Sequence, residues 1–279
     1  MRLQDLNIGL LTCLSVLLLP AKSPAIERNG ATGGRENALA QAVIALPGPF
    51  SVFHNQAFLT ETKTISLGIG YRQPYSIAGY NDCYLALIFP TSSMVYAVGI
   101  AQSSIGEYKE TNVGFSLAKE LGRNFSAGIL FNYFSLNFPE SGHCRGSIQV
   151  DGGIRYQPSA HLSLGFHLQN MAVSKIETFQ YSLNFPLVIR AGVSSRLTDR
   201  LLLSAETICE KYSDPAFRFG SEFLLGNGLS LRGGISTRPF MHSFGFGYTW
   251  SFCQLDFALV HHEILGYTPS LSFNFNFKR

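Results

Sequence analysis

The chain has 279 residues, of which 46% are hydrophobic and only 14% are charged, and its formal net charge is +3. Soluble domains carry about 25% charged residues, so the charged share is low for a chain of this length. The mild charge and the lack of a lysine- or arginine-rich cluster argue against nucleic acid as a partner.

Residues 1–25 predict a secretory signal peptide. Arg2 precedes a short apolar run at 8–19, and the small residues Ser23 and Ala25 place the cleavage site after Ala25. The run is too short for an uncleaved membrane anchor, and a lipoprotein signal at Cys13 is weaker because the run continues past it. Four cysteines remain after export into an oxidising compartment, namely Cys83, Cys144, Cys209 and Cys253. Their spacing selects neither a disulfide pairing nor a metal site.

Residues 26–63 differ in character from the rest of the chain. Small residues recur at helical spacing over 33–42, and the Pro-Gly-Pro sequence at 47–49 must end any helix there. The residues alone leave two interpretations open, namely a disordered leader and a compact segment folded into the mouth of the following domain.

From residue 64 to 279 the sequence predicts a barrel domain of about fourteen β-strands. Each predicted strand has roughly nine to thirteen residues, the length that a tilted strand needs to cross a membrane. No apolar run in this part of the chain is long enough for a membrane helix. Turn residues separate the strands. The predicted strands are 64–72, 82–90, 94–104, 111–119, 122–135, 146–157, 160–170, 186–197, 201–212, 215–225, 229–238, 241–252, 254–263 and 269–278.

The connections alternate in length. Every second one is tight, whereas 73–81, 136–145 and 171–185 are longer, although those near 213 and 239 are short. Outer-membrane barrels have short periplasmic turns and longer outer loops, so the long connections mark the outer side and both termini face the periplasm.

The end of the chain indicates which face meets lipid. From 240 to 252 the even positions are bulky and mostly aromatic, while the odd positions are small or polar. A period of two places these sets on opposite faces of a strand. We therefore predict an all-β, transmembrane antiparallel barrel in a Gram-negative outer membrane, with Phe244, Phe246 and Phe273 facing lipid and the small residues facing inward.

Nearly all strand charges share the inward parity. They predict either a ladder of ion pairs that closes a narrow lumen or a polar site for a passing solute. These candidate lumen charges are Asp151, Arg155, Arg190, Glu206, Arg218, Glu222 and Arg232.

With a barrel predicted, two motifs become informative. Gly34-Arg35, the run at 38–42 and the run at 53–59 resemble the N-terminal signature of PorV/PorQ-like and FadL-like outer-membrane proteins, and 261–269 resembles the ending of PorQ-like members. Gln41, Gln56 and His262 depart from that pattern. The resemblance implies fourteen strands and an N-terminal plug, with these plug-motif residues: Gly34, Arg35, Asn55, Ala57 and Leu59. We expect Arg35 to pair with a lumen carboxylate, the candidates being Asp151, Glu206 and Glu222.

The sequence shows no catalytic constellation, so we predict no enzymatic activity and no cofactor. No G-x-S-x-G motif occurs. His261 and His262 are adjacent, and neighbouring strand residues point to opposite faces, so they cannot chelate a metal ion together.

Two functions follow from the resemblance. The first is a plugged barrel that serves a type IX secretion system or surface assembly, with secretion components or surface proteins as partners besides outer-membrane lipid, and 73–81 and 171–185 as contact surface. The second is a FadL-like channel for hydrophobic small molecules. The small, polar inward residues of the strands favour the assembly role, because an apolar solute gains nothing by leaving lipid for such a wall.

Overall fold

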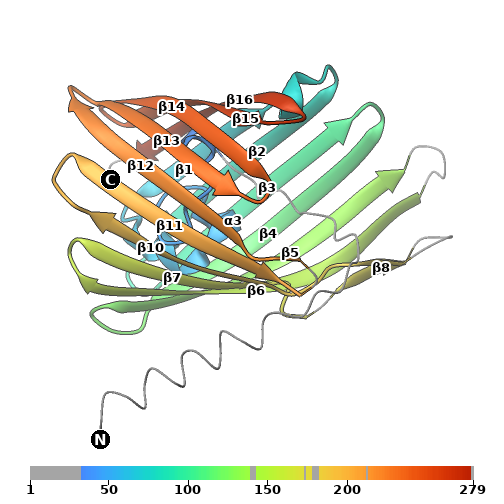
Figure 1. Ribbon diagram of the computed structural model, residues 1–279. Coiled ribbons are helices and arrows are strands. Elements are labelled where there is room, and N and C mark those ends of the chain that lie inside the picture. Colours follow the sequence, from blue (N-terminus) through green and yellow to red (C-terminus); the bar gives the residue numbers. More distant parts are fainter. Residues whose placement is uncertain (1–32, 139–142, 173, 178–181, 212, 278–279) are drawn as a thin grey trace, which may run out of the picture.

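The computed structural model describes residues 33–138, 143–172, 174–177, 182–211 and 213–277, and the predicted signal peptide lies outside them. Fourteen strands form one closed antiparallel barrel, in which β1 (Ile65–Arg72) pairs with both β2 (Tyr80–Pro90) and β16 (Gly266–Phe277). Figure 1 shows this ring of tilted strands. The predicted fold class and strand number are thereby confirmed.

The other barrel strands follow the predicted order with small changes in their bounds. They are β3 (Val95–Ile105), β4 (Tyr108–Glu120), β5 (Phe125–Phe138), β6 (His143–Ser159), β7 (Leu162–Gln169), β10 (Val188–Arg196), β11 (Leu201–Glu210), β12 (Ala216–Gly226), β13 (Leu229–Thr237), β14 (Phe240–Trp250) and β15 (Cys253–His262). Strand β16 starts before Pro269 because this proline pairs with Leu259 inside the strand and its carbonyl accepts a hydrogen bond from Gln73.

The long outer connections contain local structure that the sequence analysis did not predict. The connection between β7 and β10 carries a small hairpin of β8 (Lys175–Glu177) and β9 (Ser182–Asn184). The connection between β1 and β2 contains the 3₁₀ turn η2 (Pro74–Ser76). Among the described residues, no helix has the length and apolar character needed to cross a membrane.

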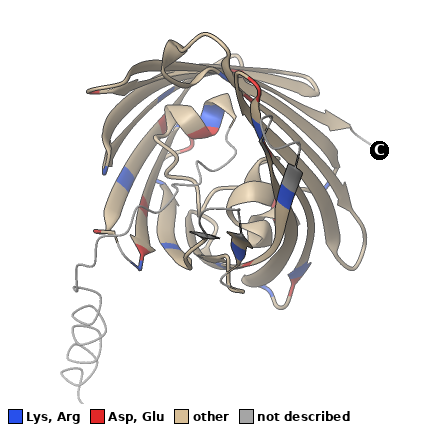
Figure 2. Ribbon diagram, turned by 90° about the vertical axis from the view of Figure 1, so that its right-hand side faces the viewer, with Lys and Arg blue, Asp and Glu red and all other residues tan. Residues whose placement is uncertain are grey.

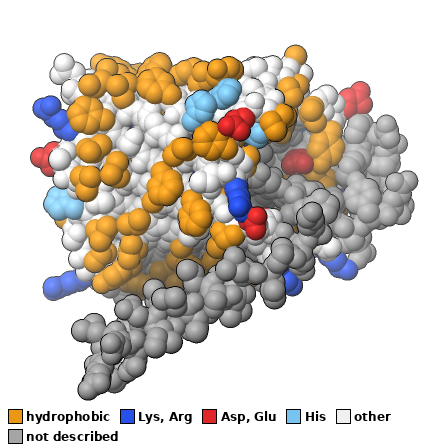
Figure 3. All heavy atoms as spheres, in the orientation of Figure 1, with side chains coloured by type: hydrophobic (Ala, Val, Ile, Leu, Met, Phe, Trp, Pro, Cys, Tyr) orange, Lys and Arg blue, Asp and Glu red, His pale blue; other side chains and the backbone are white. Residues whose placement is uncertain are grey.

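The side chains of β14 and β16 lie on the faces that the alternation near the C-terminus predicts. Phe244 is 59% exposed and Phe246 is 41% exposed on the outer surface, and Phe273 is partly exposed. Gly245 lies between the first two and is buried on the inward face. On the face of the barrel drawn in Figure 3, hydrophobic side chains far outnumber charged ones, as a wall that faces lipid requires.

Residues 33–62, here called the N-terminal segment, lie within the ring of strands (Figure 2). The segment forms α2 (Gly34–Ala38), α3 (Ser51–His54) and the 3₁₀ helix η1 (Gln56–Glu61). Helix α2 is shorter than the small-residue spacing over 33–42 predicts, because Ala40 and Gln41 adopt positive φ angles of 50° and 61°. These left-handed residues end the helix and turn the chain along the wall.

The N-terminal segment packs directly on the small inward face of the barrel. A Cβ atom added at Gly128 would lie 2.6 Å from the backbone carbonyl carbon of Gln56, and one at Gly234 would lie 2.5 Å from that of Leu39. The small residues of the inward face therefore leave room for the backbone of the N-terminal segment. A hydrophobic cluster joins the segment to β2, β3 and β4: Phe50, Val52, Leu59, Tyr84, Ala86, Ile88, Val95, Ala97 and Ala118.

Candidate functional site

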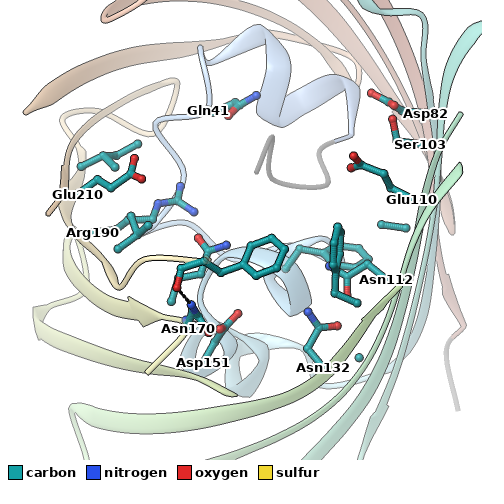
Figure 4. A pocket seen from close by; sticks show the side chains of 18 of the residues that line it. Gln41, Asp82, Ser103, Glu110, Asn112, Asn132, Asp151, Asn170, Arg190 and Glu210 are labelled. Atoms are coloured by element: carbon teal, nitrogen blue, oxygen red, sulfur yellow. Dashed lines mark hydrogen bonds between the residues drawn. The ribbon is translucent and has the colours of Figure 1, made fainter. Parts of the chain in front are cut away.

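A cavity of about 630 Å³, here called the outer chamber, lies between the N-terminal segment and the outer connections. Gln41 and Phe53 of the segment line it from one side, and Asp214 and Arg238 line it at the outer connections. Figure 4 shows polar side chains from many strands pointing into this one space. Side chains from both the wall and the segment therefore define its chemistry.

One side of the outer chamber carries Asp82, Ser103 and Glu110, which lie together in Figure 4. Asp82 is 2% exposed, and its Oδ2 atom accepts hydrogen bonds from Nε and Nη2 of Arg72 at 2.8 and 2.6 Å. The hydroxyl of Tyr84 donates to the same oxygen at 3.1 Å. A buried carboxylate needs such charge-assisted partners, so this group is fixed in place.

The opposite side is built around Arg190 and Glu206. Arg190 Nε donates to Glu206 Oε1 at 2.7 Å, while Glu206 Oε2 accepts the backbone N–H groups of Val43 and Ile44, each at 3.0 Å. Glu206 is 3% exposed, and each of its oxygens has a charged or backbone partner. Glu206 therefore links Arg190 to the backbone of the N-terminal segment.

Asn170 holds the connection between β7 and β10 against the chamber. Its backbone N–H donates to Asp151 Oδ1 at 2.7 Å, and its side-chain oxygen accepts from N and Oγ of Ser174 at 3.1 and 2.9 Å. Its side-chain amide donates to the carbonyl groups of Phe185 and Pro186, both of which line the chamber. Asn170 has a φ of 59°, a left-handed conformation that asparagine tolerates.

The outer chamber also has an apolar surface. Phe134 of β5 and Phe185 of the outer connection pack edge to face, with ring centroids 5.1 Å apart. Phe53 of the N-terminal segment and Leu130 of β5 line the same chamber. The parity of the strands could not reveal this surface, because two of its aromatic rings come from residues outside the barrel strands.

On the periplasmic side, the N-terminal segment joins a chain of ion pairs. Arg35 Nε lies 2.8 Å from Glu222 Oε2, Arg232 Nε lies 2.6 Å from the same oxygen, and Arg232 Nη1 lies 2.7 Å from Asp256 Oδ1. Among the three carboxylates considered for Arg35, the structure selects Glu222. A second cavity, of about 340 Å³, is lined by Arg35, Glu222 and Arg232 together with residues of the turn at 226–229.

The other plug-motif residues lie at contacts within the segment or with the wall. Asn55 donates from its side chain to the carbonyls of Ile44 at 3.0 Å and Ile154 at 3.2 Å, and accepts from the N–H of Ala57 at 3.2 Å. Gly34 donates its N–H to Ser272 Oγ at 2.8 Å. Leu59 is fully buried in the cluster against β2 to β4.

The seven predicted lumen charges lie on the interior of the barrel, and six of them are buried, with Glu222 the more accessible one. Arg155 pairs with Glu61 of the N-terminal segment. The sequence analysis missed Arg72, Asp82 and Asp256. All three have the inward parity of their strands, so extending the same parity test to every strand is the signal that finds them.

His54 of the N-terminal segment faces positive groups of the wall. It is 3% exposed, and neither ring nitrogen has a hydrogen-bond partner among the described residues. Burial, followed by the charges of Arg190, His167 and Arg218, holds the pKa of His54 well below its ordinary value. The segment therefore packs around a neutral imidazole.

The sequence alone assigned neither a metal site nor a disulfide pairing. In the part of the chain that the structure describes, no group of three or more histidine, cysteine or acidic side chains is arranged to hold a metal ion. Cys83, Cys209 and Cys253 are free thiols, and the side chain of Cys144 lies outside the described residues.

Several solved outer-membrane channels share this fold. The CymD monoaromatic hydrocarbon channel has a TM-score of 0.66 and 14% identity, over 89% of this chain and 98% of that one. The Ralstonia pickettii toluene transporter TbuX has a TM-score of 0.66 and 13% identity, over 91% and 100%. A Pseudomonas aeruginosa FadL homologue has a TM-score of 0.63 and 12% identity, over 88% and 98%.

At these identities the comparison shows a shared fold, that of FadL-type outer-membrane barrels, and it agrees with the predicted outer-membrane location. CymD and TbuX are described as a channel and a transporter. They do not confirm the PorV/PorQ part of the resemblance. No protein-family model and no curated protein matches the chain.

Proposed function

We propose that this protein is an outer-membrane channel that admits a small, mainly apolar organic molecule from the outer face. The outer chamber carries this proposal. Its volume of about 630 Å³ falls within the range of about 300–1,000 Å³ of small-molecule sites. Phe53, Phe134 and Phe185 offer aromatic surface there, so an apolar ring that leaves water is stabilised by burial.

The polar lining refines the class of substrate. Asp82, Glu110 and Arg190 share the chamber with the aromatic rings. A hydrocarbon cannot hydrogen-bond to these groups, whereas a ring with a hydroxyl, carbonyl or amino substituent can add a hydrogen bond to them. We therefore infer a monoaromatic or similarly sized molecule with at least one polar substituent.

The N-terminal segment closes the route below the chamber. Gln41 and Phe53 line the outer chamber, whereas Arg35 lines the second cavity on the periplasmic side, so the segment separates the two. In this proposal, a substrate reaches the periplasm only when part of the segment moves. The assembly role has no comparable observation in its favour, and the comparisons favour the channel.

Uptake by cells tests the proposal. Cells that produce the protein are compared with cells that lack it, using radiolabelled toluene and benzyl alcohol. Ala101 lines the outer chamber, so Ala101→Trp fills part of it and should lower uptake several-fold. Ile100→Trp is the matched control, because the neighbouring residue is exposed on the outer surface.

The proposal predicts faster uptake with the wild-type protein, a clear reduction in the Ala101→Trp variant and no change in the Ile100→Trp variant. The increase in uptake over cells without the protein should be larger for benzyl alcohol than for toluene. Equal uptake with and without the protein, or equal uptake by the two variants, would show that the chamber is not a transport route.

A further inference from the structure

His242 of β14 and His261 of β15 are cross-strand partners on the outer surface of the barrel. Their ring centroids lie 4.7 Å apart, with the ring planes inclined by 41°. The pair lies one position in from the outer end of the hairpin, where Met241 pairs with His262. Histidine side chains gather over this region in Figure 3. The sequence analysis considered only His261 with His262, whereas the sheet brings His261 to His242.

The spacing of the two rings fits shared coordination of one metal ion. A metal–nitrogen bond of about 2.0–2.1 Å puts the centroid of an imidazole ring about 3.2 Å from the ion. At a nitrogen–metal–nitrogen angle of about 90–110°, two such centroids then lie about 4.5–5.2 Å apart. The observed 4.7 Å falls within this range.

The surroundings of His261 define which nitrogen is available. Its Nδ1 atom is buried and has no hydrogen-bond partner among the described residues, so a ligand of this ring must bond Nε2. The ring of Tyr267 covers the other side of His261, at a centroid distance of 4.6 Å. His262 is already engaged, because its Nδ1 accepts the N–H groups of Ile264 and Leu265 at 3.1 and 3.3 Å.

We propose that His242 and His261 form a surface site for a divalent first-row transition-metal ion such as Cu²⁺, Ni²⁺ or Zn²⁺. Two neutral imidazoles are suitable ligands for these ions, and water completes the coordination. Mg²⁺ and Ca²⁺ prefer oxygen ligands and should not bind. The site lies on the outside of the wall, so its occupation is independent of the transport route proposed above.

Metal titration of the untagged protein in detergent tests this site. The protein is stripped with a chelator and titrated calorimetrically with Cu²⁺, and detergent alone gives the background. We expect one Cu²⁺ per barrel. Loss of outer-shell partners alone weakens metal sites by about 10–100-fold, so His242→Asn and His261→Asn should each weaken binding by about tenfold or more. His161→Asn, at an exposed histidine of the β6–β7 turn, is the control and should bind like the wild type.

The electron paramagnetic resonance spectrum of the Cu²⁺-loaded wild type provides a second measurement that needs no variant. Two coordinated imidazole nitrogens support the site, whereas one or none overturns it. Unchanged affinity in both single variants, with their folding verified by gel mobility before and after heating, also overturns it. So does Mg²⁺ binding that competes with Cu²⁺.

Discussion

Substitution of Gly128 provides a direct test of how the N-terminal segment is held. A Cβ atom at this position would lie 2.6 Å from the carbonyl carbon of Gln56 and 2.7 Å from the backbone nitrogen of Ala57. Non-bonded carbon atoms need about 3.5–4.0 Å, so the backbone of the segment must retreat by about 1 Å. Such overpacking typically costs about 1–3 kcal/mol. In Gly128→Ala we therefore expect η1 to leave the wall while the ladder of β5 persists.

Planar-bilayer conductance and thermal unfolding measure this effect. Gly128→Ala should raise the mean conductance per barrel and lower the melting temperature by several degrees. Gly122→Ala is the matched control, because Gly122 lies in the turn before β5 and an added Cβ meets no atom within 4 Å. Gel mobility before and after heating verifies that both barrels are folded.

Equal conductance and equal melting temperature for the two variants would refute the reasoning. That result would mean that the segment does not rest on Gly128. A Gly128→Ala barrel with a lower melting temperature but unchanged conductance would instead mean that the segment rests there but that its position does not limit the pore.

Three further predictions concern the lipid face, the segment and pH. Phe246→Arg puts a charge on the lipid-facing wall and should reduce the stability of the barrel, measured by refolding into bilayers, by about 2–4 kcal/mol. Phe240→Arg, at the outer end of the same strand, should cost only about 0–1 kcal/mol, and equal costs would contradict the assigned depth. Asn55→Asp replaces the amide that donates to Ile44 and Ile154, so the segment should lose about 1–3 kcal/mol of stability in urea unfolding, with no loss if these hydrogen bonds are unimportant. Because the folded pKa of His54 is depressed, the unfolded chain binds more protons below pH of about 6.5, and stability should fall there by up to about 1.4 kcal/mol per pH unit. His54→Gln should remove that part of the slope in melting curves between pH 5 and 8, and an identical slope would rule out His54 as the cause.

The barrel was predictable because lipid imposes a strict pattern on each strand. The alternation over 240–252 assigned Phe244 and Phe246 to the outside and Gly245 to the inside, as the structure shows. The same parity placed the strand charges inside. Turn residues and strand lengths then gave the order and number of strands, since a closed barrel satisfies every backbone group by pairing with neighbours.

The contacts between distant parts of the chain were not predictable in this way. Three carboxylates were equal candidates for Arg35, and only the strand register brings Glu222 within 2.8 Å. The apolar surface of the outer chamber depends on Phe53 and Phe185, which lie outside the strands and therefore follow no strand parity. His242 and His261 form a pair only because a hairpin aligns them.

The pattern also misled in one respect. We took the small inward residues as evidence for a hydrated, polar wall, and hence for an assembly role. Gly128 and Gly234 are small because the backbone of the N-terminal segment occupies the space of a side chain. Gly245 is in the same position, since a Cβ there would lie 2.6 Å from Ala38 Cβ.

The close approach at these glycines divides the barrel wall into two regions with different freedom to evolve. Where the segment touches the wall, a larger residue would meet its backbone, so we expect few substitutions to be tolerated there. Around the outer chamber, side chains as different as Ala101, Asn132 and Phe134 share the lining. Under the proposed channel function, substitutions in the outer half should alter solute selectivity while the contacts of the N-terminal segment in the lower half stay intact.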